Sequence, residues 1–145
     1  MKEKLLSCIL YVVLPLALGV LLYLWIKPDA WCSQMIYRLL HIPKQSAFDE
    51  NSVPIIGTFI KHQLCDVLFA FSLTFALLLL LVNHSRGIAL GCAIALSFEV
   101  MLEVAQLSVF PGNFDIYDII AESVVTIAIY IAIKIIQAKR RRKIK

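Results

Sequence analysis

The chain has 145 residues, of which 61% are hydrophobic, and its mean hydropathy is +0.85. Because an ordinary globular domain is about half apolar, this composition excludes a typical soluble protein and predicts one whose solvent is the lipid bilayer. The formal net charge of +4 describes no single region, since basic residues gather at the two ends of the chain.

The apolar residues fall into four segments of about 20 residues each, at about 5–26, 64–82, 88–110 and 116–136. At a rise of about 1.5 Å per residue, a helix of this length spans the hydrocarbon core of about 30 Å. The sequence therefore predicts an all-α polytopic membrane protein, with residues 1–138 forming one four-transmembrane-helix bundle. Within that domain residues 27–63 form an outer loop with a short interfacial helix, and residues 139–145 follow as a basic cytoplasmic tail.

The basic residues favour a cytoplasmic position for both termini. Lys2 and Lys4 precede the first span, and the segment 139–145 after the last span is rich in lysine and arginine. Under the positive-inside rule both ends face the cytoplasm, which an even number of spans permits. A basic tail can bind nucleic acid, but beside a membrane span it is more typical of an anchor on anionic lipid. Membrane lipids are therefore expected partners and nucleic acid is not.

The first span contains a proline and ends in aromatic residues. Pro15 kinks a membrane helix at modest cost where neighbouring helices cover the freed carbonyl group. Tyr23 and Trp25 are typical of the outer interface. The stretch from Leu5 to Cys8 imitates a lipoprotein cleavage box, but the apolar residues follow the cysteine, so we expect the span to be retained.

In the outer loop, Trp31, Met35, Leu39 and Ile42 recur at helical spacing. Polar side chains fall mostly on the opposite face of this segment, which predicts an amphipathic helix lying flat on the bilayer surface. A helix that caps the bundle would show much the same pattern, and Pro43 should end the helix in either case.

The four cysteines form no Cys-x-x-Cys motif and have no zinc-binding spacing, so the sequence predicts neither a metal site nor a cofactor. Cys32 and Cys65 both fall on the predicted outer side, where a disulfide is chemically allowed. The sequence leaves their pairing open.

The second span begins with a histidine and a carboxylate on one helix face, because His62 and Asp66 are four residues apart. Such a pair can relay protons, hold a metal ion, or satisfy itself at the membrane interface, and the last interpretation is favoured. The short connection at 83–87 makes the second and third spans antiparallel neighbours. The third span then opens with small residues that allow close helix packing: Gly87, Gly91, Ala93 and Ala95.

The stretch from Glu99 to Glu122 is the most polar part of the apolar segments. On the third span Glu99, Glu103 and Gln106 share one helix face. The same spacing returns beyond a Pro-Gly-Asn turn, in Asp115, Asp118 and Glu122. Two helices joined by so short a turn lie antiparallel, so the two acidic stripes should lie side by side, with Glu103 and Glu122 at one depth.

With Asp66, these residues place six carboxylates in the outer half of the bundle, where an ionised side chain costs roughly 3 kcal/mol. Lys61 and His62 are the only bases that the sequence suggests nearby. Protonation of some carboxylates, a water-filled crevice open to the outside, or a bound cation such as a metal ion, a proton or a ligand amine would each compensate the charge. These alternatives stay open.

Part of this pattern has a purely structural explanation. Asp115 and Asp118 can cap the N-terminus of the fourth helix, and Glu103 and Gln106 can hydrogen-bond across helices to a neighbouring span. Glu99 and Glu122 lie too deep for capping, so a functional crevice is favoured for them. Two carboxylates at one depth can also serve as general acid and base on a glycan, but no recognisable catalytic motif is present, and enzymatic activity is left open.

A longer pattern spans the turn, where Glu103-x-x-Gln106 is followed by Phe-Pro-Gly-Asn-Phe-Asp-Ile-x-Asp at 110–118. It resembles the signature of the VanZ-like family of small bacterial membrane proteins: a Glu-x-x-Gln helix end, a Pro-Gly-Arg turn, a Phe-Asp-x-x-Asp stretch and then Asn-x-x-Gly. In this chain Asn113 stands where that pattern has arginine, and Glu122 stands where it has asparagine. Both departures make the pocket more acidic, so it should not recognise an anion through an arginine.

The resemblance implies a multi-pass protein of the bacterial plasma (inner) membrane and the cell envelope. For the founding member of the family it also implies a link to reduced susceptibility to teicoplanin, a glycopeptide antibiotic. The resemblance does not indicate a chemical reaction for this chain.

Together these patterns predict an outward-facing acidic crevice that engages a cationic or hydroxyl-rich envelope component. Its candidate ligand-binding residues are Glu99, Glu103, Gln106, Asn113, Asp115, Asp118, Glu122, His62 and Asp66. Two alternatives stay open: a non-catalytic interaction subunit of a larger membrane complex, which would use the polar stripes as helix–helix contacts, and a proton- or cation-coupled small transporter. Four short spans would need to oligomerise to form such a transporter.

Overall fold

The computed structural model of the protein describes residues 2–41, 63–84, 86–107 and 114–143, together with residues 43 and 57. In this part of the chain the fold is all-α, as predicted from the sequence. Three helical stretches are long and apolar enough to cross a membrane: Glu3–Ile26, Gly87–Gln106 and Ile116–Lys139.

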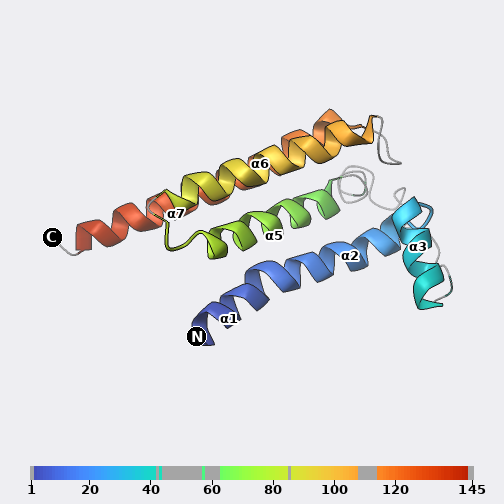
Figure 1. Cartoon of the computed structure of the whole chain (residues 1–145), viewed down its shortest axis with the longest axis horizontal. Helices are drawn as coiled ribbons and strands as arrows, with labels where there is room; N and C mark the ends of the chain where they lie inside the picture. The colour runs from blue at the N-terminus through green and yellow to red at the C-terminus, as the bar shows by residue number, and fades with distance from the viewer. Residues whose placement is uncertain are drawn as a thin grey trace.

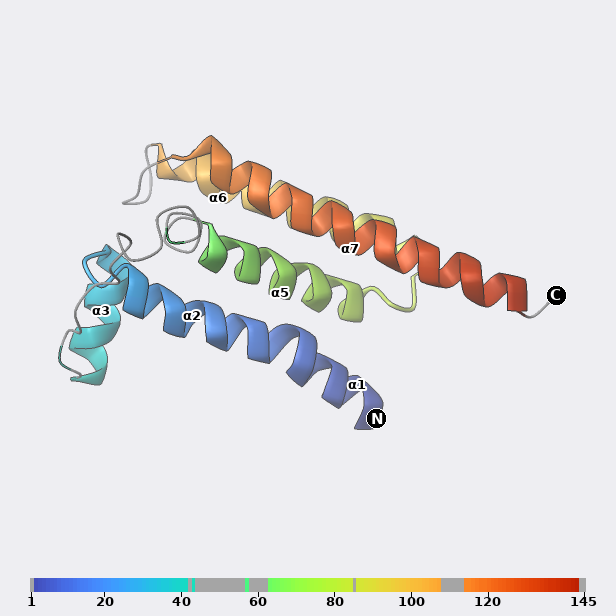
Figure 2. The same ribbon diagram turned by 180° about the vertical axis from the view of Figure 1, so that it is seen from behind.

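The first of these stretches is one rod built from α1 (Lys2–Cys8), the π-helical segment η1 (Ile9–Val13) and α2 (Leu14–Ile26). After it come α3 (Trp31–Leu40), α5 (Leu64–Leu80), α6 (Gly87–Gln106) and α7 (Ile116–Lys143). Helix α5 lies between the N-terminal rod on one side and α6 with α7 on the other, and it contacts all of them (Figures 1 and 2). Both ends of the chain lie toward the same end of the bundle, opposite α3.

Pro15 explains the widened turn in the N-terminal rod. Proline has no backbone N–H and its ring clashes with the preceding turn, so the regular i to i−4 ladder cannot continue through it. The Leu14 N–H instead donates to the Ile9 carbonyl oxygen, five residues back. The Ser72 hydroxyl of α5 donates to the Val12 carbonyl oxygen at 2.8 Å. A neighbouring helix thus covers the opened turn, as the sequence predicts.

Small residues set the helix spacing on both sides of α5. A Cβ added to Gly19 would lie 3.4 Å from the Leu68 Cβ, so α2 approaches α5 closely at this position. On α6 the small residues Gly87, Gly91 and Ala95 are buried, whereas Ala93 is exposed. Three of the four small residues expected to pack therefore do so.

The helix bounds differ from the predicted spans by a few residues at their ends. Helix α5 stops at Leu80 rather than 82, where the turn toward α6 begins, and its length of about 26 Å falls slightly short of the hydrocarbon core. Helix α6 ends at Gln106 rather than 110. Helix α7 runs to Lys143, beyond the apolar residues, because lysine and arginine are good helix formers and suit a helix C-terminus.

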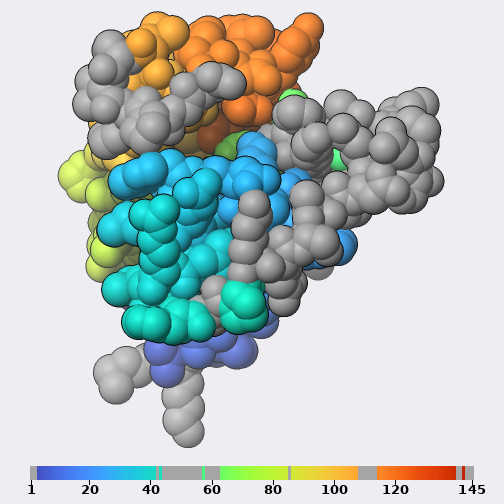
Figure 3. All heavy atoms as spheres, turned by 90° about the vertical axis from the view of Figure 1, so that its right-hand side faces the viewer, coloured from blue at the N-terminus to red at the C-terminus, as the bar shows by residue number. Residues whose placement is uncertain are grey.

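Helix α3 lies across the end of α2, and Figure 3 views the molecule from this end. The Tyr37 hydroxyl donates to the Leu24 carbonyl oxygen at 2.8 Å and so ties α3 to α2. Trp31, Met35 and Leu39 are all exposed on it. The helix ends before the expected Ile42, which lies outside the described residues, because His41 turns left-handed with φ of 54°.

Candidate functional site

Three glutamates from the two acidic stripes are buried inside the bundle. The side chains of Glu99 and Glu103 on α6 are 1% and 6% exposed, and that of Glu122 on α7 is 6% exposed. On α6 the buried face runs through Gly91, Ala95, Glu99 and Glu103, which are spaced by four residues. These three glutamates thus face the interior of the bundle, as expected from their spacing.

Glu99 belongs to a hydrogen-bonded chain that joins three helices. The Thr126 hydroxyl of α7 donates to Glu99 Oε1 at 3.4 Å, and it lies 3.0 Å from the Thr74 hydroxyl of α5. Because a hydroxyl has one proton to donate, Thr74 must be the donor to Thr126. Both threonine side chains are completely buried, so the chain of bonds lies inside the bundle.

Glu103 is held nearer the α6–α7 turn. Its Oε1 accepts a hydrogen bond from Gln106 Nε2 at 2.9 Å, and its Oε2 accepts one from the Asp115 backbone N–H at 3.4 Å. The bond between Glu103 and Gln106 lies within α6. The link between helices runs instead from Glu103 to the backbone at the start of α7.

Asp115 caps α7, as the sequence predicts for this residue or Asp118. Its Oδ1 accepts a hydrogen bond from the Tyr117 backbone N–H at 2.8 Å, which is the geometry of a helix N-cap. Asp118 and Glu122 follow one and two turns into the same helix. Capping therefore accounts for Asp115 and leaves the deeper carboxylates unexplained.

Several buried carboxylate oxygens have no hydrogen-bond partner in the described part of the chain. They are Asp66 Oδ2, Glu99 Oε2, Asp118 Oδ1 and Glu122 Oε2. Buried polar atoms in folded proteins are nearly always bonded, so a group of unsatisfied oxygens in one region calls for an explanation.

The carboxylates are close enough for their charges to act on one another, and we call the following set the carboxylate cluster: Asp66, Glu99, Glu103, Asp115, Asp118 and Glu122. The charges that act on Glu122 are all acidic and come from Glu99, Asp66, Glu103 and Asp118. The positive charge of Lys27, which follows the end of α2, also acts on Asp66 and Asp118. Three helices and the end of a fourth thus contribute charges to one region.

Lys27 corrects the expectation that Lys61 and His62 are the only bases near the cluster. Its ammonium nitrogen lies 5.7 Å from the centre of the Tyr23 ring, at the C-terminal end of α2. Two of the predicted site residues, His62 and Asn113, lie outside the described residues, as does Lys61. The expected pair of His62 and Asp66 is therefore not described.

The polar interior ends at the two threonines. Farther toward the chain termini, the buried positions of α6 and α7 in the described residues are small or apolar, among them Gly91, Cys92 and Ile129. The hydroxyl residues Ser72, Thr74 and Thr126 were not predicted as site residues. The spacing in the sequence could have indicated the two threonines. Thr126 lies four residues after Glu122 and Thr74 lies eight after Asp66, so each shares a helix face with a carboxylate of the site.

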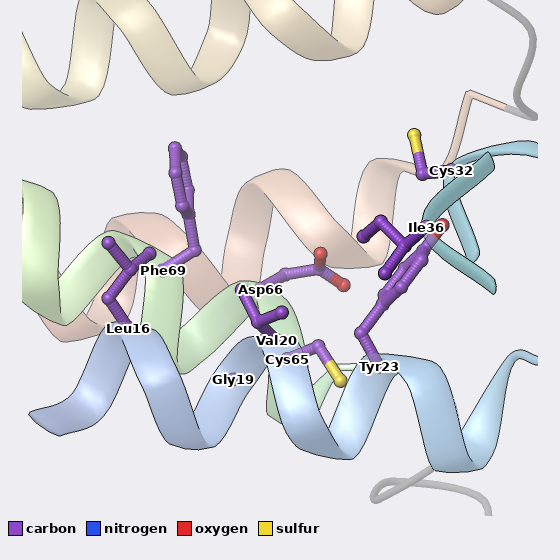
Figure 4. Close-up of a pocket in the computed structure, with 9 residues that line it drawn as sticks. All are labelled: Leu16, Gly19, Val20, Tyr23, Cys32, Ile36, Cys65, Asp66 and Phe69. Carbon is purple, nitrogen blue, oxygen red and sulfur yellow. The ribbon is translucent and has the colours of Figure 1, made fainter. Parts of the chain in front are cut away.

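A cavity of about 260 Å³ lies beside the cluster, and we call it the α2–α5 groove (Figure 4). Residues of α2, α3 and α5 line it, and Asp66 is the one carboxylate among its described lining residues. Cys32 and Cys65 both line the groove as free thiols, so the disulfide that the sequence left open is not formed. Among the described residues, no group of three or more histidine, cysteine, aspartate or glutamate side chains is placed to hold a metal ion.

Comparison with known proteins gives no match: no family model, no curated protein and no solved structure is similar to this chain. Its function is therefore inferred from its own residues.

Proposed function

We propose that this protein is a multi-pass protein of the bacterial plasma membrane that binds the cationic or hydroxyl-rich group of a cell-envelope component in the carboxylate cluster. The main support for the proposal is the burial of Glu99 and Glu122. Each of them has an oxygen without a hydrogen-bond partner in the described structure. A buried acceptor without a donor costs about 1–3 kcal/mol, and more when it is charged. A ligand that brings ammonium or hydroxyl donors would remove this cost at several carboxylates at once.

In this proposal α5 crosses the membrane as a fourth span, with Asp66 in its first turn at the outer interface. The two termini then lie together on the cytoplasmic side, where the basic residues of the α7 end face anionic lipid. Helix α3 lies in the outer interface with Trp31, Met35 and Leu39 in contact with lipid. The cluster consequently opens toward the outside, where envelope components are found.

The resemblance of residues 103–118 to the VanZ-like signature links the proposal to the bacterial envelope. On that basis we propose that binding affects susceptibility to glycopeptide antibiotics of the teicoplanin type. The acidic departures, above all Glu122, favour a ligand with amines or many hydroxyl groups over an anionic one.

Binding is favoured over transport because the polar interior stops at Thr74 and Thr126. A transport path needs polar groups or water on both sides of the membrane midplane. In the described residues the half of α6 and α7 nearer the termini buries Gly91, Cys92 and Ile129 instead. This arrangement favours binding at the carboxylate cluster over passage across the membrane.

The test uses dicyclohexylcarbodiimide, an apolar reagent that modifies carboxyl groups in apolar surroundings, with the full chain in detergent or lipid. We expect peptide mass spectrometry to find Glu99 and Glu122 modified, and ethanolamine or glucosamine to slow the total modification, counted as the N-acylurea plus the amide that forms when the amine displaces dicyclohexylurea from the activated carboxyl group. Sodium acetate at the same ionic strength is the control. Modification at an unchanged rate in the presence of both amines would contradict the proposal.

A cell-based test uses the Glu122→Gln variant, which keeps the shape of the side chain and removes its charge. If expression of the chain lowers teicoplanin susceptibility, this variant should lose the effect while its membrane level stays normal. Glu3→Gln, at the exposed N-terminal end, is the matched control. Parallel loss of membrane level and effect would instead indicate a structural role for Glu122.

A further inference from the structure

The α2–α5 groove is apolar along its length and charged at one end. Leu16, Val20 and Tyr23 line it from α2, and Phe69 lines it from α5. Leu16 and Tyr23 are seven residues apart, so the groove follows α2 for about 10 Å. This shape suits part of one aliphatic chain lying along the helix.

Figure 4 shows the Asp66 carboxylate among the lining side chains, between α2 and Ile36 of α3. Its Oδ2 is buried and has no hydrogen-bond partner in the described structure, so it can accept a bond from a ligand. Helix α3 covers this end of the groove, where Cys32 and Ile36 contribute to the lining. The carboxylate thus marks one end of an otherwise apolar site.

A positive charge lies at the same end. Lys27 attracts Asp66, and its ammonium nitrogen lies over the ring of Tyr23, which lines the groove. An acidic and a basic group at one end of an apolar groove are complementary to a headgroup that carries both charges. Among common membrane lipids, an ethanolamine phospholipid has such a headgroup and also has N–H donors.

We propose that the α2–α5 groove binds one ethanolamine phospholipid, with its ammonium group on Asp66, its phosphate near Lys27 and an acyl chain along α2 and α5. Phosphatidylcholine has the same charges but no N–H donor for Asp66. Phosphatidylglycerol has no positive charge. Lipid binding here goes beyond the proposed function and does not require it, although Asp66 belongs to both sites.

The experiment measures lipid retention by native mass spectrometry on the full chain, with ethanolamine, choline and glycerol phospholipids of identical acyl chains. We expect one ethanolamine lipid to be retained with about tenfold or greater preference, since a hydrogen bond to a charged group is worth about that factor. Equal retention of the three lipids would overturn the proposal.

Two variants locate the site. Asp66→Asn should abolish the preference for the ethanolamine lipid, and Val20→Trp should fill the groove and abolish retention. Leu21→Trp is the matched control, because Leu21 is the next residue on α2, is 63% exposed and does not line the groove. Circular dichroism and thermal melting confirm that each variant is folded. An unchanged preference in a folded Val20→Trp variant would overturn the proposal.

The same variants separate the groove from the carboxylate cluster. Val20→Trp should leave the carbodiimide reaction of Glu122, and its protection by ethanolamine, unchanged. Loss of lipid preference with that protection intact assigns the lipid to the groove alone. Loss of both in a folded Val20→Trp variant would overturn the assignment to a separate groove.

Discussion

Replacing Thr126 by valine tests the buried polar chain that joins α5, α6 and α7. Valine keeps the branched shape of threonine and removes only the hydroxyl group. That hydroxyl lies 3.0 Å from the Thr74 hydroxyl and donates to Glu99 Oε1 at 3.4 Å. Because Glu99 Oε2 already has no partner in the described structure, the substitution leaves both oxygens of a buried carboxyl group without a donor.

The expected loss follows from these contacts. A hydrogen bond between membrane helices is worth about 0.6 kcal/mol on average, and a buried acceptor left without a donor costs about 1–3 kcal/mol. Thr126→Val should therefore lower the free energy of unfolding by about 2 kcal/mol, roughly 30-fold in the folding constant. Thr74→Val removes one bond and leaves the donor to Glu99 in place, so we expect a loss of about 0.6 kcal/mol.

The assay is reversible unfolding in mixed micelles, with increasing dodecyl sulfate and helicity as the readout. The double variant of Thr74 and Thr126 should be hardly less stable than Thr126→Val, because the two residues act through one chain of bonds. Ser97→Ala is the control, since that exposed hydroxyl bonds only the Ala93 carbonyl oxygen of its own helix. Equal losses for the two threonine variants would refute the reasoning.

Three further predictions concern the cap, the helix contacts and the orientation. Asp115→Asn keeps a good N-cap and removes one charge from the cluster, so it should be about 1 kcal/mol more stable in the same unfolding assay than Asp115→Ala; equal stability would argue against the cap. Gly87→Ala should lose about 1–3 kcal/mol there, because its Cβ would collide with the Leu81 carbonyl oxygen. In Gly91→Ala the tightest contact of the new Cβ is a movable side-chain carbon at 3.3 Å, and the nearest backbone atom lies at an ordinary contact distance of 3.5 Å. Its gain in helix propensity of up to about 1 kcal/mol should leave it nearly neutral; similar losses for the two alanine variants would contradict this. A membrane-impermeant maleimide should label the exposed Cys32 in intact cells, whereas labelling only after lysis would contradict an outer position for α3.

The sequence predicted most of the helices because apolar composition leaves a membrane chain few other choices. Residues in the lipid must bond their own backbone groups, so each long apolar run becomes a helix. The inward direction of Glu99, Glu103 and Glu122 followed from spacing alone, since residues four apart share a helix face.

The parts that the sequence did not predict depend on contacts between distant segments. Lys27 acts on Asp66 and Asp118 only because α2 packs beside α5, and no local pattern shows this. The roles of Thr74 and Thr126 were missed for a different reason. A threonine in a membrane helix can bond its own backbone, so its residue type alone does not show that it faces another helix.

Helix α6 buries two glutamates and α7 buries one, in segments long and apolar enough to cross a membrane, where an ionised group costs roughly 3 kcal/mol on insertion scales. The α7 side supplies a donor to each glutamate of α6, since the Thr126 hydroxyl donates to Glu99 and the Asp115 backbone N–H donates to Glu103. Helix α6 is therefore poorly suited to leave the translocon without α7. The two are expected to enter the bilayer together as a helical hairpin, so biogenesis of the protein should depend on the pair being synthesised before either half is released into lipid.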